Sequence, residues 1–108
     1  MEDMLIEANK FAELLKEHKG GDVTVLDLRQ KNAWTDFFVI ATVTSRAHTE
    51  GLLRFIKEKA EEDGLEILRH RRKLVPEDEW ALIDMGNLVI HLMTEKSRAF
   101  YELERLWA

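Results

Sequence analysis

The chain has 108 residues, of which 45% are hydrophobic and 34% charged, and its formal net charge at pH 7 is −5. This balance is typical of a globular protein rather than a disordered one. The length fits one domain over residues 1–108, and a domain of this size buries roughly 65% of its unfolded surface. The absence of Cys excludes disulfides and thiolate metal sites. The acidic balance means that the overall field of the protein does not attract bare nucleic acid.

Neither an export signal nor a membrane span is evident. The first residues, MEDMLIEANK, carry acids where a signal peptide carries bases. No apolar run approaches the ~20 residues that a membrane span needs. The lack of Cys suits a reducing compartment. We therefore expect a cytoplasmic protein with no membrane partner.

The first part of the chain predicts one helix and two strands. Apolar residues at helical spacing begin at Met4, and the glycine pair at 20–21 ends the pattern. The β-rich runs 23–28 and 37–44 predict two strands. Residues 30–34 form a polar connection between them.

The middle of the chain predicts a second helix and a third strand. Ser45 is a suitable N-cap for a helix that reaches Asp63, before a glycine stop. Residues 65–71 predict a strand. Residues 73–79, around Pro76, predict a loop.

The last part of the chain predicts two strands around a turn at 85–87, followed by a helix over 95–107. The apolar face expected for this helix consists of Phe100, Leu103, Leu106 and Trp107. The full order is α-β-β-α-β-β-β-α. It predicts an α/β protein in which helices pack on a mixed sheet of about five strands.

The sequence carries no recognised catalytic pattern, so we expect neither an enzyme nor a cofactor. Neither Ser45 nor Ser97 lies in a G-x-S-x-G turn, and the five glycines form no phosphate-binding loop. The four histidines form no zinc motif. One interpretation of Asp36, Asp84 and His91 is a metal site that they form across strands. The other is that the two carboxylates accept backbone hydrogen bonds at strand ends.

The predicted strand over 80–84 raises a choice between a core and a binding surface. Alternation places Trp80, Leu82 and Asp84 on one side of the sheet, with Ala81 and Ile83 on the other. If the latter pair packs under a helix, the outward Trp beside a carboxylate has the chemistry of an interface hot spot. The alternative is that Trp80 fills the core and Asp84 caps the turn.

The run Arg69-His-Arg-Arg-Lys73 concentrates positive charge in an acidic protein. One interpretation is an edge strand whose charges prevent pairing with other sheets. The other is local contact between RNA phosphates and Arg69, Arg71 and Lys73.

Three segments together resemble the ribosomal silencing factor family, also called the Iojap family. They are T-D-F-F-V-I-A-T with the following His48, W-x-x-x-D-x-G-N-x-V-I-H-L-M, and S-R-x-x-Y-E-L-E-R-L-W, which ends at Trp107. The resemblance implies an α/β fold related to nucleotidyltransferases. It also implies binding to the large ribosomal subunit through ribosomal protein L-fourteen, which blocks joining of the small subunit when nutrients are short. An assembly role at the large subunit is one alternative, and a nucleotide-binding enzyme, suggested only by the kinship of the fold, is the other.

The resemblance also implies where the partner binds. The face with Trp80, Leu82 and Asp84 becomes the expected protein-binding surface, which Asp36 extends and His91 supports or joins. A local contact with ribosomal RNA and a homodimer through the sheet or its edge are further expectations. The chain departs from the family pattern at Val43, where the family has Gly, and at Ala47, where it has Arg.

Overall fold

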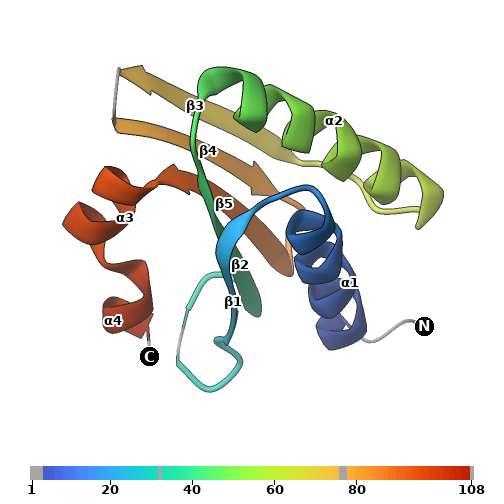
Figure 1. Ribbon diagram of the computed structural model, residues 1–108. Coiled ribbons are helices and arrows are strands. Elements are labelled where there is room, and N and C mark those ends of the chain that lie inside the picture. Colours follow the sequence, from blue (N-terminus) through green and yellow to red (C-terminus); the bar gives the residue numbers. More distant parts are fainter. Residues whose placement is uncertain (1–3, 32, 76–77, 108) are drawn as a thin grey trace.

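A five-stranded mixed sheet forms the centre of the protein, with helices on both of its faces (Figure 1). The structure, a computed structural model, describes residues 4–31, 33–75 and 78–107. The strand order is β1-β2-β5-β4-β3, in which β2 and β5 are parallel and the other neighbours antiparallel. The elements are α1 (Met4–Glu17), β1 (Gly21–Asp27), β2 (Phe37–Val43), α2 (Arg46–Glu62), β3 (Arg69–Val75), β4 (Asp78–Asp84), β5 (Leu88–Thr94), α3 (Glu95–Tyr101) and α4 (Leu103–Trp107).

The predicted α/β class, with a mixed sheet of about five strands, is confirmed. Helices α1 and α2 cover one face, which we call the closed face (Figure 1). Alternate residues of the strands point into it. Its buried core includes Phe11, Leu15, Val39, Ala41, Leu52, Ile56, Ala81, Ile83, Ile90 and Leu92.

Helices α3 and α4 lie on the opposite face, which we call the open face (Figure 1). Its buried cluster is smaller and consists of Leu28, Phe38, Ile40, Val89, Met93 and Leu103. Trp80 and Leu82 pack against this cluster but are only half-buried. The two helices therefore leave the β3–β4 side of the open face accessible.

The ends of α1 and α2 follow the predicted signals, with one difference. Ser45 caps α2 by accepting a hydrogen bond from the backbone N–H of His48 at 3.0 Å. After α1 the left-handed residue is Lys19, with φ 69°, rather than a glycine. Gly20 is needed for a separate reason, because a Cβ there would lie 2.8 Å from the carbonyl oxygen of Leu15.

The prediction of a single helix over 95–107 is wrong, because the helix is interrupted between α3 and α4. Glu102 adopts φ 46° and ends α3. This turn redirects the expected apolar face, so that Leu103 is buried while Phe100 is 78% exposed and Leu106 71% exposed. The side chain of Trp107, also assigned to that face, lies outside the described part of the chain.

The third strand begins later and ends later than the sequence predicted. Residues 65–68 are not a strand, and β3 extends through Val75 instead of giving way to a loop at Lys73. Arg69 pairs with Asp84, the last residue of β4, so no partner strand exists beyond that point. The predicted loop residue Pro76 lies outside the described residues.

Candidate binding surface

Trp80 occupies the middle of the accessible part of the open face. Its indole N–H donates a hydrogen bond to Nδ1 of His91 at 3.0 Å. Its ring lies 4.7 Å from the ring of Tyr101, centroid to centroid. Because strand, hydrogen bond and ring contact all fix the indole, Trp80 is a rigid aromatic side chain that is still half-exposed.

His91 lies directly beneath Trp80 and is only 2% exposed. Because Nδ1 accepts the hydrogen bond from Trp80, the ring proton is on Nε2. Burial lowers the pKa of His91 from 6.5 to about 4, so the ring is neutral near pH 7. The ring of Phe38 meets it edge-on at 4.4 Å. His91 is thus placed to support Trp80 from below.

A polar network fixes Tyr101 beside Trp80. Nζ of Lys73 donates a hydrogen bond to the Tyr101 hydroxyl at 3.1 Å and forms an ion pair with Asp78. The hydroxyl of Ser97 donates to the same Asp78 carboxylate. The hydrogen bond from Lys73 lowers the pKa of Asp78, and in return Asp78 raises the pKa of Lys73. The charge of Lys73 is therefore already matched within the protein.

A hollow of about 240 Å³ lies beside the indole, and we call it the Trp80 hollow. It is lined by Arg71, Arg72, Lys73, Trp80 and Leu82. Arg71 and the neighbouring Arg69 are exposed, whereas Arg72 pairs with Glu50 of α2 at 3.7 Å. The lining thus combines an aromatic and an aliphatic side chain with positive charge at the rim.

Asp84 and Asp36 lie at the far end of the sheet from Trp80. Asp84 is 8% exposed and accepts a hydrogen bond from the backbone N–H of Gly86 at 2.8 Å, so it caps the turn after β4. Asp36 is half-buried directly before β2. Asp84 lies four residue steps along the strand from Trp80, or about 13 Å. The structure therefore does not bring the two carboxylates into one cluster with the indole.

The metal alternative gains no geometric support. Among the described residues, no group of three or more His, Cys, Asp and Glu side chains could hold an ion. The Asp36, Asp84 and His91 combination is not such a group, because His91 is buried under Trp80 and Asp84 binds its own turn. Within the same part of the chain, no helix is long and apolar enough to cross a membrane.

Arg98, from the last segment of the resemblance, joins α3 to the sheet. Its guanidinium, 7% exposed, donates to the hydroxyls of Thr42 and Thr24, each at 3.0 Å. It also forms an ion pair with Glu104 of α4 at 2.8 Å. Arg98 therefore packs inside the protein rather than facing a partner.

Two aromatic residues of the open face make contacts that the sequence does not indicate. Tyr101 matches the family motif in the last predicted helix, and the structure adds its contact with Trp80. Trp34 was placed in a polar connection, yet it is 59% exposed and meets the ring of Phe38 edge-on at 6.1 Å. The sequence does carry a signal for the exposure of Trp34. It is a Trp in an otherwise polar segment, where no neighbouring apolar residues form a core around it.

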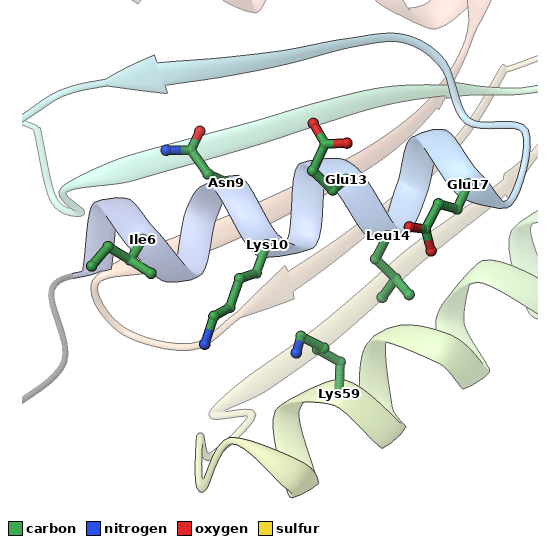
Figure 2. A pocket seen from close by; sticks show the side chains of 7 residues that line it. All are labelled: Ile6, Asn9, Lys10, Glu13, Leu14, Glu17 and Lys59. Atoms are coloured by element: carbon green, nitrogen blue, oxygen red, sulfur yellow. The ribbon is translucent and has the colours of Figure 1, made fainter.

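A second hollow lies away from this surface, in a groove between α1 and α2 (Figure 2). It has a volume of about 510 Å³ and is lined by Ile6, Asn9, Lys10, Glu13, Leu14, Glu17 and Lys59. The cations there are already paired, Lys10 with Glu7 at 3.5 Å and Lys59 with Asp63 at 3.3 Å. This groove belongs to the closed side and shares no residue with the Trp80 hollow.

The geometry defines a small mixed α/β protein with one sealed sheet face and one face that presents an ordered aromatic surface. The family described as "Ribosomal silencing factor during starvation" matches residues 2–108. A ribosomal silencing factor from Treponema pallidum is 37% identical over 100 residues, covering 93% of this chain and 88% of that protein. The chain therefore belongs to the ribosomal silencing factor family, as the resemblance predicted.

Two further comparisons extend this relationship. A crystal structure of a protein from Chromobacterium violaceum superposes with a TM-score of 0.84 at 30% identity, covering 99% of this chain and 87% of that one. The mouse protein named "Mitochondrial assembly of ribosomal large subunit protein 1" is 30% identical over 99 residues, covering 87% of this chain and 42% of that protein.

Proposed function

We propose that this chain is a non-enzymatic repressor of translation in the cytoplasm. It binds the large ribosomal subunit through ribosomal protein L-fourteen and thereby blocks joining of the small subunit when nutrients are short. Family membership supports the general role, since relatives are named ribosomal silencing factors. The protein partner and the block on joining are the specific content of the proposal.

The observation that carries the proposal is the indole of Trp80, which is held in place by its neighbours yet keeps part of its surface exposed. A rigid aromatic side chain in a partly apolar surface is the typical anchor of a protein interface. His91 and Tyr101 hold the indole in one orientation before any partner arrives, so binding costs little side-chain entropy. An indole that only filled the core would need no such exposed position.

The other predicted residues take different places in the proposed interface. Leu82 meets the partner beside Trp80, because both line the same hollow. Asp36 extends the contact at the far end of the sheet. His91 and Asp84 act indirectly, since both are buried. Homodimer formation through another part of the sheet is compatible with this arrangement, and sedimentation of the free protein measures it.

A role as an assembly adaptor for the large subunit is the second candidate. The name of the mouse relative supports it. The same surface would serve both functions, but an adaptor would leave subunit joining unaffected. A nucleotide-binding enzyme would need converging acids in a concave pocket. In the described part of the chain, Asp84 accepts a hydrogen bond from its own turn rather than from Asp36.

The test is a pull-down of large subunits by the purified protein, using subunits with and without protein L-fourteen. We expect capture only by subunits that contain this protein. Trp80→Ala should weaken binding by roughly 30- to 700-fold, which corresponds to the 2–4 kcal/mol typical of a hot-spot residue. Ile6→Ala is the matched control, since Ile6 is a half-exposed apolar residue of the closed side.

Two results would contradict the proposal. Equal capture of subunits lacking protein L-fourteen would exclude this partner. An unfolded Trp80→Ala variant, seen by circular dichroism, would show that the indole belongs to the core. Addition of small subunits to the captured complex then separates the two candidates, because a repressor blocks their joining and an adaptor does not.

A further inference from the structure

Strand β3 is an open edge of the sheet (Figure 1). It pairs with β4 on one side, and no described strand pairs with its other side. Its residues Arg69, His70, Arg71, Leu74 and Val75 are exposed. An edge of this kind presents backbone N–H and C=O groups to which a further strand can bind.

Only part of the positive charge on this edge is matched within the protein. Lys73 pairs with Asp78, and Arg72 pairs with Glu50. Arg69 and Arg71 form no ion pair with any residue that the structure describes. Two uncompensated guanidinium groups thus lie on one strand of a protein whose net charge is −5.

The two arginines have the spacing of a paired strand. Arg69 lies opposite Asp84 and Arg71 opposite Leu82, so both occupy the open face with Trp80. Residues two apart in a strand lie about 7 Å apart on the same side. An added strand has the same repeat, so its alternate side chains would stand directly opposite these arginines. Arg71 lines the Trp80 hollow, so this hollow adjoins the position of such a strand.

We propose that the β3 edge binds an acidic strand of a protein partner, next to the Trp80 hollow. Two alternate carboxylates of that strand pair with Arg69 and Arg71, its backbone extends the sheet, and an apolar side chain enters the Trp80 hollow. This inference rests on the proposed function, because it specifies the chemistry of the protein that contacts the same face.

A protein strand fits these observations better than RNA or a second copy of the chain. RNA has no backbone N–H and C=O groups at the spacing of a strand, so it cannot continue the sheet at the free edge of β3. A second β3 edge would bring the arginines of both copies together, and like charges on paired strands are destabilising.

The binding test uses the full chain and a fluorescein-labelled peptide of eight residues that alternates Glu and Thr and carries one Leu in place of a Glu, so that the Leu lies on the same face of the strand as the remaining Glu residues. We expect saturable anisotropy with a Kd below about 1 mM, the value that corresponds to −4 kcal/mol. Arg69→Gln with Arg71→Gln should weaken binding at least tenfold. The matched control is Arg54→Gln, because Arg54 is an exposed arginine of α2.

Two control peptides test strand addition itself. A peptide N-methylated at alternate residues keeps its charges but cannot pair along one side, and it should lose binding. A peptide with the same composition and its Glu residues adjacent should bind more weakly, because only alternate positions face the arginines. Equal binding of all three peptides would mean that charge alone is recognised and would overturn the proposal.

Other outcomes decide between the rival occupants. Absence of peptide binding at about 1 mM, together with salt-sensitive binding of a twelve-nucleotide oligouridine that depends on Arg69, would assign the edge to RNA. Aggregation of the double variant without loss of any ligand would assign the arginines to edge protection. If Trp80→Ala abolishes subunit capture while the double variant retains it fully, the proposed function stands and this inference falls.

Discussion

The two faces of the sheet differ in how completely helices cover them, although the same strands contribute alternate residues to both. On the closed face, α1 and α2 cover a continuous core, and central residues such as Phe11, Ile56 and Ile90 have no exposed surface. On the open face, α3 and α4 are short and cover one end, so Trp80 and Leu82 remain half-exposed. The closed face stabilises the fold, and the open face combines ordered side chains with accessible surface.

The difference also appears in how polar groups are used. Near the open face, buried His91 and Arg98 hold aromatic residues and helices in place through hydrogen bonds. The closed face relies mainly on apolar packing, with ion pairs such as Arg46 with Glu79 at its margin. Polar networks fix orientation more strictly than apolar contacts do, and orientation is what a binding surface requires.

The largest expected effect comes from a change in the closed face. Phe11→Ala removes a fully buried ring, and it should lower the free energy of unfolding by about 3–5 kcal/mol. Urea denaturation measures this loss. Phe100→Ala is the matched control, since Phe100 is 78% exposed and should change stability by less than about 0.5 kcal/mol. Comparable losses from both variants would contradict the distinction between the faces.

The next effect is a dependence of stability on pH through His91. Its pKa is about 4 in the folded protein and 6.5 when unfolded, so the unfolded state binds the proton first as pH falls. The contribution is complete above pH 6.5 and is lost as pH decreases towards 4. The total is about 3.5 kcal/mol, from about 1.4 kcal/mol for each pKa unit.

Comparison with His91→Gln isolates this contribution. The side-chain oxygen of Gln can accept a hydrogen bond but does not titrate in this range. Burial also lowers the pKa of His70, and that residue is present in both proteins. We therefore expect the stability difference between them to shrink between pH 7 and pH 4. A constant difference across this range would mean that His91 is not held neutral beneath Trp80.

A smaller effect is expected from Arg98, which joins α3 to β1 and β2. Arg98→Ala should lower the free energy of unfolding by about 2–3 kcal/mol, the value for a lost charged hydrogen-bonding group. The acidic partners Asp22 and Glu104 are 85% and 37% exposed, so water can replace the ion pairs. Hydrogen exchange should show the loss first in α3, and uniform destabilisation of α1 and α2 would contradict the assigned role.

The sequence predicted the closed face better than the open face. Apolar spacing in α1 and α2 and alternation at Ala81 and Ile83 correctly indicated that core. The sequence did not indicate the interruption between α3 and α4, because the left-handed residue there is Glu102 rather than a glycine. The network among Lys73, Asp78 and Tyr101 joins residues up to 28 positions apart, and periodicity carries no information about such contacts.

The local sequence pattern predicted which residues of the candidate surface share a face, but not how deeply each one is buried. Alternation correctly placed Trp80 and Leu82 together, since it depends only on strand geometry. The burial of each residue depends on which other elements cover it. For this reason Trp80 is partly exposed whereas Asp84 is buried. The pairing of His91 with Trp80 required the register between β4 and β5, which the turn over 85–87 sets.

The smallest expected effect is the response to small ligands, and its predicted value is zero. The sequence has no Cys, no zinc-type His pair and no phosphate-binding glycine loop, and the described residues hold no group of three metal ligands. The accessible part of the open face around Trp80 instead suits a macromolecule.

In thermal shift assays, divalent metals, ATP and GTP should leave the melting temperature unchanged. A ligand at 100 times its Kd would stabilise the fold by roughly 2.7 kcal/mol, which such an assay detects. A shift of that size, abolished by Arg71→Gln but retained in Arg54→Gln, would mean that the open face has a small-molecule site and that its assignment to a protein partner is incomplete.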